Sequence, residues 1–254
     1  MADIKTRGIV LKTSDYKDND KLIRLYTLEH GKITALARGV KKANAKLKIP
    51  AQVFCFGEYL MTGNIGGGGA FPVMTGCTVE ESFFSLASDP DKFSAAASVM
   101  ELVDKALPQG ERNPAVFVRA LKTMREFLRA HAYYDGEGDS RKACKTILLN
   151  FTLEFLGLSG YNPRLEKCCV CGESRLRERS FDFSACGAAC KRCAGYNSAG
   201  MSALCHGVLS AAQRCGAERL DTLNLDAKGL DEALALCKQI AEYVFEIKIL
   251  STYF

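Results

Sequence analysis

Four cysteines spaced as two Cys-x-x-Cys pairs constrain this 254-residue chain more than any other feature: Cys168 with Cys171, and Cys190 with Cys193. The eighteen residues between the pairs match the spacing of a closed Cys₄ zinc site. Two intervening residues let both sulfurs of a pair face one ion, and Gly172 directly after the first pair can take the positive φ that turns the backbone there. Because four thiolates leave no position open for water or substrate, the sequence predicts a structural Zn²⁺, one per chain, rather than a catalytic metal.

The remaining cysteines leave two alternatives open. Cys169 lies inside the first pair and Cys186 lies four residues before Cys190, so either thiol is near enough in sequence to replace a ligand, although we expect neither to do so. The competing interpretation of the four spaced cysteines is a pair of disulfides or unrelated buried thiols. Six further cysteines mostly lie in apolar patterns, where a free cysteine packs as a small hydrophobic residue: Cys55, Cys77, Cys144, Cys205, Cys215 and Cys237.

Length and composition indicate the broad class of protein. A chain of 254 residues can bury a substantial core in more than one domain. No apolar run approaches the roughly 18 residues needed to span a bilayer, and the segment MADIKTRG at the start has no apolar signal stretch. We therefore expect a cytoplasmic protein with no membrane association, whose cysteines are reduced and bind metal rather than form disulfides.

The positive charge is concentrated at the start of the chain. Residues 1–80 hold 12 Lys and Arg against 7 Asp and Glu, whereas the remaining residues hold 22 of each. Such asymmetry is typical of a protein that binds a polyanion, most often nucleic acid. We interpret its densest part, the basic cluster, as a DNA-binding segment, and the alternative is a solvated loop without a partner. The basic cluster consists of Arg38, Lys41, Lys42, Lys46 and Lys48.

The first 80 residues have the pattern of a small β barrel. Five stretches rich in β-branched and aromatic residues show partial period-two alternation: 4–12, 21–28, 32–37, 53–62 and 71–80. Five short strands with a break after the third are typical of a barrel of the OB type, and an SH3-like barrel is the main competitor. In OB barrels the face of the second and third strands and its flanking loops bind oligonucleotides, and the basic cluster directly follows the third predicted strand.

After residue 82 the pattern becomes helical. Apolar residues recur at helical spacing in five segments: 90–107, 114–132, 140–158, 202–215 and 230–250. Pro90 and Pro114 fall in first helical turns, where proline is tolerated. The sequence therefore predicts an α+β protein of several domains: an OB-type barrel at 1–81, a mainly helical domain in two parts at 82–162 and 198–254, and a Cys₄ zinc module inserted between those parts at 163–197.

Two further sets of residues are candidates for binding. Five aromatic residues of the barrel segment are available to stack on bases, although at least half of them must be structural: Tyr16, Tyr26, Phe54, Phe56 and Tyr59. Four basic residues recur at three- and four-residue steps on one predicted helix and so form a stripe: Arg119, Lys122, Arg125 and Arg129. This stripe could extend a nucleic-acid track or bind an acidic peptide, and the alternative is the solvent face of an amphipathic helix.

The common catalytic patterns are missing from the sequence. The glycine run 66–69 is not followed by the Lys-Ser/Thr of a phosphate-binding loop, and neither a Gly-x-Gly-x-x-Gly pattern nor a Gly-x-Ser-x-Gly elbow occurs. None of the three histidines stands in the His-x-Glu pattern that zinc deaminases require. We therefore expect a protein that is not an enzyme.

With these features together, the chain resembles the RecO family of bacterial recombination mediators along essentially its whole length. The order and spacing of the motifs carry the resemblance more than any single motif does. The chain departs from the family pattern in Asp18, where glutamate is more usual, and in Cys186, which stands in place of the first residue of a glycine pair. The similar segments are TRGIVL at 6–11, YKDND at 16–20, TLEHGK at 27–32, ARGVKK at 37–42, and the surroundings of the cysteine pairs at 165–172 and 183–193.

The resemblance implies a non-enzymatic role in homologous recombination and gap repair. It implies binding to single- and double-stranded DNA, annealing of strands coated with single-strand-binding protein, and help to RecA, together with RecR, in replacing that coating. It also implies docking of the acidic, apolar C-terminal tail of the single-strand-binding protein, which we expect near Arg125 and Arg129. Because some family members lack the zinc cysteines, the metal is expected to hold the fold rather than to define the activity. The expected location is the cytoplasm, in association with the nucleoid.

Two other functions remain as alternatives. A zinc-containing protein-interaction adaptor would use the basic barrel to bind an acidic protein in place of DNA. An enzyme acting on nucleic acid would need a catalytic constellation, for which the sequence offers no pattern. Loss of oligonucleotide binding on charge reversal of the basic cluster distinguishes the DNA-binding interpretation from the adaptor.

Overall fold

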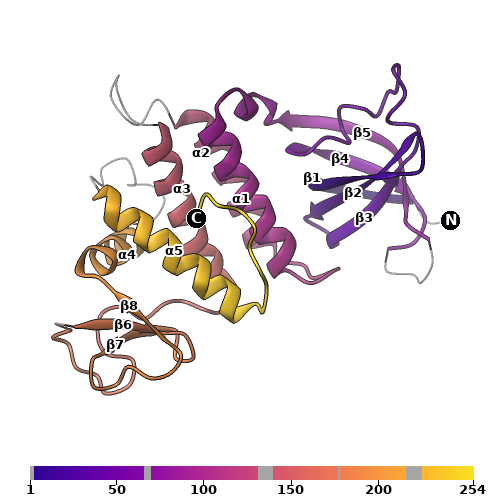
Figure 1. Ribbon diagram of the computed structural model, residues 1–254. Helices are drawn as coiled ribbons and strands as arrows, with labels where there is room; N and C mark the ends of the chain where they lie inside the picture. Colours follow the sequence, from indigo (N-terminus) through magenta and orange to yellow (C-terminus); the bar gives the residue numbers. More distant parts are fainter. Residues whose placement is uncertain (1–2, 66–69, 131–139, 177, 216–224) are drawn as a thin grey trace. The chain divides into compact units, whose positions relative to one another are not determined.

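The computed structural model describes residues 3–65, 70–130, 140–176, 178–215 and 225–254 (Figure 1). The chain divides into two compact units, which we call the barrel unit (residues 1–90 with 100–121) and the helical unit (residues 91–99 with 122–254). Strands dominate the first 82 residues and helices the rest, so the predicted α+β class is confirmed. The glycine run 66–69 lies outside the described residues.

Five strands close into a barrel in the order β1-β2-β3-β5-β4: β1 Asp3–Tyr16, β2 Asp20–Thr27, β3 Gly31–Ala37, β4 Cys55–Thr62 and β5 Val73–Ser82. β1 pairs with both β2 and β4, and β3 meets β5 in a parallel pairing at Leu36 and Val73. The predicted five-stranded OB-type barrel is confirmed. β1 is longer than predicted because its second half is polar and largely exposed, yet still pairs with β2 beyond an irregularity between Val10 and Lys12.

A buried tyrosine lies among the apolar side chains of the barrel core. Tyr59 is fully buried beside Val10, Ile23 and other aliphatic residues. Its hydroxyl donates to the backbone carbonyl of Pro50 over 2.9 Å and to that of Cys55 over 3.2 Å, which satisfies a polar group that would otherwise be costly to bury. Burial raises the pKa of Tyr59 far above its ordinary value, so the ring stays neutral. The bond to Pro50 also ties the long connection between β3 and β4 to the core.

Two helices contribute to the barrel unit after the short 3₁₀ helix η1 (Phe84–Ser88): the end of α1 (Pro90–Ala106) and the start of α2 (Pro114–Arg129). Both begin at the prolines predicted for first helical turns. Phe117 packs at 5.8 Å from the ring of Tyr26 and at 6.2 Å from that of Phe56, and the Tyr26 hydroxyl donates to the Asn113 carbonyl over 3.0 Å. Through these contacts, the start of α2 covers the rings of Tyr26 and Phe56 on the barrel.

Four of the five aromatic candidates for base stacking are therefore structural: Tyr26, Phe54, Phe56 and Tyr59 are all buried. Only Tyr16 remains partly exposed. The prediction that at least half of these rings serve the fold is confirmed, and Tyr16 is the ring left for binding.

A partly buried ion cluster also links α1 to the barrel strands. The Arg24 Nη1 atom donates to both carboxylate oxygens of Asp104, over 3.0 and 2.9 Å. The buried Lys32 ammonium donates to the Asp104 backbone carbonyl and lies 3.8 Å from its carboxylate. Burial lowers the pKa of Lys32, although the carboxylate of Asp104 opposes that shift.

Gly31, in the turn that starts β3, is essential for the barrel unit. Its φ of +63°, and a Cβ that would lie 2.0 Å from the backbone oxygen of Glu111, exclude any side chain. We expect Gly31→Ala to lower the free energy of unfolding by about 2–5 kcal/mol, from left-handed strain plus overpacking. Gly110→Ala is the matched control, because its φ is +77° but its Cβ would meet nothing within 4 Å, so it should cost only about 1 kcal/mol. Urea unfolding of both variants measures the difference, and equal losses would contradict the steric argument.

The helical unit is built around α3 (Ser140–Leu158), which contacts α4 (Ala203–Cys215) and α5 (Ala227–Val244). Twelve of the residues of α3 are buried, so this helix is covered by the rest of the unit on most of its circumference. α4 is capped by Ser202, whose hydroxyl accepts from the Cys205 backbone N–H over 3.0 Å. The predicted helices of this region are confirmed, apart from the end of the last one.

The last helix ends earlier than the predicted residue 250. Glu246 takes a left-handed φ of 53°, and the Ile247 N–H bonds to the Glu242 carbonyl, which closes the helix at Val244. The Glu242 carboxylate then accepts from the Ile249 N–H over 2.8 Å. Beyond the helix, Ile249 and Tyr253 are buried without helical backbone, whereas Leu250 is exposed. The apolar pattern predicted a helix up to residue 250 because apolar residues continue beyond Val244, although their backbone is not helical.

Candidate metal centre and nucleic-acid interface

The two cysteine pairs lie at the turns of a small three-stranded sheet in the order β7-β6-β8: β6 Arg179–Asp182, β7 Gly187–Cys190 and β8 Ser198–Met201. The first pair precedes β6 and turns through a bond from the Gly172 N–H to the Cys168 carbonyl over 2.9 Å. Gly172 has a φ of +78°, as its predicted role in the turn requires. The second pair starts at the last residue of β7 and turns through a bond from the Cys193 N–H to the Cys190 carbonyl, also over 2.9 Å.

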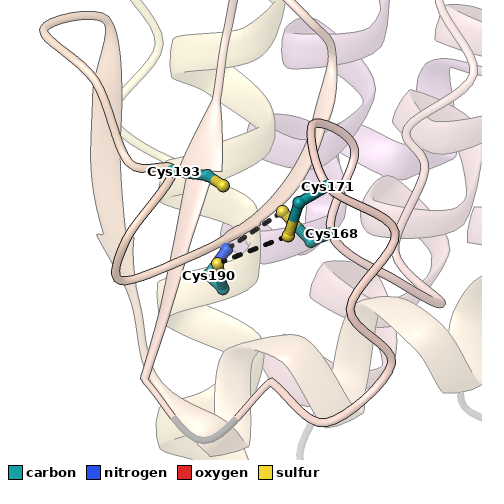
Figure 2. A group of neighbouring side chains, drawn as sticks. All are labelled: Cys168, Cys171, Cys190 and Cys193. Carbon is teal, nitrogen blue, oxygen red and sulfur yellow. Dashed lines mark hydrogen bonds between the residues drawn. The ribbon is translucent and has the colours of Figure 1, made fainter.

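These turns bring the four sulfurs together (Figure 2). The Sγ atoms all lie within 4.8 Å of one another, and those of Cys171 and Cys190 are 3.8 Å apart. A tetrahedral zinc ion with Zn–S bonds of about 2.3 Å has sulfur–sulfur edges of about 3.8 Å. The cluster is therefore of the right size and ligand type for one zinc ion, and its four residues are Cys168, Cys171, Cys190 and Cys193.

The surroundings of Cys168 and Cys190 favour the thiolate, which is the metal-binding form, whereas those of Cys193 favour the thiol. Burial raises the pKa of Cys168, which is only 2% exposed, but hydrogen bonds from the backbone N–H groups of Cys171, Cys190 and Val170 outweigh it and lower the pKa to about 6. The pKa of Cys190 is also lowered, because hydrogen bonds from the Cys193 thiol and backbone outweigh its burial. The thiol of Cys193 is held protonated, with a pKa of about 12, by hydrogen bonds to Cys171 and Cys190.

Cys169 and Cys186, the two alternative ligands, do not join this cluster. The Cys169 backbone N–H bonds to the Ala188 carbonyl over 2.7 Å, as part of the sheet region. The Cys186 thiol faces the Tyr161 carbonyl at 3.6 Å, and burial raises its pKa. Within the described parts of the chain, the four spaced cysteines are the only group of three or more potential ligands close enough to share an ion.

The basic cluster lies on the connection between β3 and β4, which is a chain of successive turns. The Lys42 N–H bonds to the Gly39 carbonyl over 3.1 Å, and the Ala45 N–H to the Lys42 carbonyl over 3.2 Å. Val40 and Ala51 from the same connection are buried in the barrel core. All five basic side chains are exposed. Val40 and Ala51 thus anchor the connection in the barrel core, and its five basic side chains are exposed to solvent.

The turn between β1 and β2 adjoins this connection. The Lys41 N–H bonds to the Asn19 carbonyl over 3.1 Å, and the Gly39 N–H bonds to the Asp20 carboxylate over 2.7 Å. The loop between the first two strands is itself a binding loop in OB barrels. The two loops therefore form one surface at the same end of the barrel.

That proximity places Tyr16, a predicted stacking candidate, beside the basic cluster, together with Lys17, which was not predicted as a site residue. Tyr16 is partly exposed, and the Lys17 ammonium lies 5.5 Å from the centre of its ring. An exposed ring beside a cation is the combination on which single-stranded bases stack. The OB topology could have indicated this arrangement from the sequence, because it brings the turn between β1 and β2 beside the connection between β3 and β4. Lys41 is partly neutralised there, because its ammonium lies 3.1 Å from the Asp15 carboxylate.

The basic stripe predicted on the second helix is incomplete. Arg119 is buried, with 7% of its surface exposed, so the prediction of an exposed stripe is wrong at this residue. Lys122, Arg125 and Arg129 of α2 are exposed, and Leu128 between them is 36% exposed. Arg119 is buried because its neighbours Val116 and Phe117 on α2 pack against the rest of the unit, whatever the charge of the side chain beside them.

No helix among the described residues is long and apolar enough to cross a membrane.

Comparison with known proteins agrees with this architecture. The family model described as "Recombination protein O N terminal" matches residues 1–81, and that described as "Recombination protein O C terminal" matches residues 87–252. The chain is similar to proteins named DNA repair protein RecO from three bacteria. The similarity to the Clostridium novyi protein is 28% identity over 87% of this chain and 81% of the relative. The Desulforamulus reducens protein is 30% identical over 98% of this chain and 93% of the relative. The Listeria monocytogenes protein is 32% identical over 74% of this chain and 68% of the relative. The chain therefore belongs to the RecO family, whose role is in DNA repair and recombination.

Proposed function

We propose that this chain is a DNA-binding recombination mediator. It anneals complementary single strands coated with single-strand-binding protein and, with RecR, helps to load RecA during recombinational gap repair. The observation that carries the proposal is the basic cluster, five exposed cations on an anchored connection beside the first turn of an OB-type barrel. Membership of the RecO family supports the same role. The protein acts in the cytoplasm at the nucleoid and is not an enzyme.

Charge neutralisation explains how such a surface promotes annealing. Two complementary strands repel each other through their phosphates, and lysine and arginine lower that repulsion without reading sequence. If all five cations of the basic cluster contact phosphates, the logarithm of the binding constant should fall with the logarithm of salt concentration with a slope of about −3.5 on single strands. The same phosphate contacts serve double-stranded DNA, and no covalent step or nucleotide hydrolysis is needed.

The metal in this proposal is one structural zinc ion. Cys168, Cys171, Cys190 and Cys193 would hold it, and the sulfur separations fit its size. With four thiolates it has no open position, so its contribution is to hold the two turns of the small sheet together. We also propose that the chain folds in the four segments predicted from the sequence, with the zinc module at 163–197 as an insertion between the helical parts.

The exposed face of α2 is the proposed dock for the tail of the single-strand-binding protein. Arg125 and Arg129 suit its carboxylates, and Leu128 beside them suits its apolar side chains. We expect Arg125→Glu with Arg129→Glu to weaken binding of a labelled peptide with that tail's acidic and apolar residues by at least about tenfold, as measured by fluorescence anisotropy. The charge-matched control reverses two exposed lysines elsewhere, Lys228 and Lys248, and should bind normally. Undiminished binding by the first variant would rule out this site.

The test of the function is the annealing of two complementary oligonucleotides, each coated beforehand with the cognate single-strand-binding protein. The mediator should accelerate annealing without ATP or added metal, and high salt should abolish the acceleration. Good binding to naked DNA without acceleration would reduce the protein to a general DNA-binding module. No DNA binding at all would favour the alternative, a zinc-containing adaptor whose basic barrel binds an acidic protein.

A further inference from the structure

A cavity of about 550 Å³ lies within the helical unit, between the turn after β6 and the C-terminal end of α5. None of the four clustered cysteines, the basic cluster or the exposed α2 residues lines it. The proposed function therefore assigns no role to it. Its lining combines aromatic rings with carboxylates: Tyr161, Phe183, Tyr243, Glu242 and Glu246.

The charge of this cavity is opposite to that of the barrel surface. Glu242 and Glu246 are both in its wall, and no lysine or arginine lines it. In the described parts of the chain, neither carboxylate forms an ion pair with a basic side chain. Two carboxylates in its wall repel phosphate, so the cavity favours a cation over nucleic acid, although the Arg164 guanidinium donates to the Ala185 carbonyl in the neighbouring turn.

The aromatic side chains add a second feature of a cation site. Tyr161 is 38% exposed and Tyr243 is 44% exposed, so both rings border the opening of the cavity to solvent. The Phe183 and Tyr243 rings are 5.6 Å apart. Aromatic faces attract guanidinium and ammonium groups, and neighbouring carboxylates strengthen that attraction.

Hydrogen bonds hold these groups in place before any ligand arrives. The Tyr243 hydroxyl is 3.2 Å from the Ser184 hydroxyl and 3.5 Å from the Asn197 amide. One carboxylate oxygen of Glu242 accepts from the Ile249 N–H, which orients the group without removing its charge. The left-handed φ of 53° at Glu246, which ends the helix, sets the direction of the backbone at the second carboxylate. A site arranged in advance loses less entropy on binding.

We propose that this cavity binds the arginine side chain of a partner protein. A guanidinium is planar, so it can stack on a tyrosine ring and at the same time donate two parallel hydrogen bonds to a carboxylate, which lysine cannot do. The open rim formed by the two tyrosines leaves room for the chain on either side of that arginine. The molecule would then use a basic surface for DNA and a separate acidic, aromatic cavity for a protein.

The test uses the full-length protein and the peptide acetyl-Gly-Arg-Gly-amide, followed by NMR. We expect the peptide to shift the resonances of Tyr161 and Tyr243, and acetyl-Gly-Gln-Gly-amide to leave them unchanged. Glu242→Gln with Glu246→Gln should weaken the binding at least about tenfold. The glutamine oxygen still accepts from the Ile249 N–H, so the fold is preserved. The control variant, Glu166→Gln with Glu173→Gln, changes two exposed glutamates elsewhere in the unit and should bind normally.

Three results would overturn the proposal. The first is unchanged affinity in the Glu242→Gln, Glu246→Gln variant, and the second is the absence of any shift at the two tyrosines. The third is tight binding of free arginine or spermidine with exclusion of the peptide, which would make the cavity a small-molecule site. Because DNA binding is measured at the barrel, failure of this proposal would leave the proposed function intact.

Discussion

We expect Cys171→Ser to abolish binding of the proposed zinc ion and to destabilise the helical unit. Cys171 is exposed, so the substitution removes a thiolate ligand without leaving a cavity. Structural zinc sites contribute on the order of 10 kcal/mol to the folding of the segments they hold, because the unfolded chain has no preformed site. We therefore expect zinc content to fall from about one ion per chain to near zero. Atomic absorption on the purified protein and thermal unfolding measure the two effects.

The chain offers two matched controls for this experiment. Cys186→Ser and Cys169→Ser change neighbouring thiols that lie outside the four-sulfur cluster, so both variants should keep their zinc. Full zinc content in Cys171→Ser would mean that another thiol replaces the missing ligand. A Cys171→Ser variant that also lacks Cys186 or Cys169 would then identify which one. Loss of zinc from either single control would contradict the assignment of the ligands.

We expect reversal of three charges in the basic cluster to remove most of the proposed affinity for single-stranded DNA. Lys42→Glu, Lys46→Glu and Lys48→Glu change exposed side chains and leave the buried Val40 and Ala51 in place. Each phosphate that is no longer neutralised makes the salt dependence shallower by about 0.7, so we expect the slope to change by about 2 and the affinity at low salt to fall at least about 100-fold. Titration of a labelled oligonucleotide at several salt concentrations gives both quantities.

The control carries the same change in net charge at another place. Lys167→Glu, Lys228→Glu and Lys248→Glu reverse three exposed lysines of the helical unit. This variant should keep the wild-type slope, because a general change in net charge does not remove phosphate contacts at the barrel. Equal losses in both variants would mean that binding follows total charge, and wild-type affinity in the first variant would favour an acidic protein as the partner of the barrel.

The interface and the cavity depend on different parts of the sequence in different ways. The basic cluster lies within one short segment, so its high density of positive charge could be predicted from residues 38–48 alone. Tyr16 was also a candidate from the sequence, but its position and that of Lys17 beside the basic cluster were not predictable, because they follow from bonds between the β1–β2 turn and the β3–β4 connection. The acidic cavity is assembled from segments around residues 161, 183 and 242–246, and no local pattern connects them.

Spacing and alternation were enough to predict the cysteine cluster, the five strands and the starts of α1 and α2. Each of these depends on residues within a few positions of one another: two residues between paired thiols, a period of two along a strand, and a proline in a first helical turn. Local geometry is the same wherever such a pattern occurs, so these features are determined by the sequence by itself.

Burial was decided by the tertiary structure. Tyr26 and Phe56 are buried because Phe117 packs on them from a distant segment, and Arg119 is buried although its spacing places it with exposed basic residues. α5 ends at Val244 although the apolar pattern continues, and Ile249 beyond it is buried without helical backbone. Local sequence determines which conformation a segment prefers, whereas the side chains it meets are brought to it by the rest of the chain, and only the folded structure shows which faces remain available to bind DNA, metal or protein.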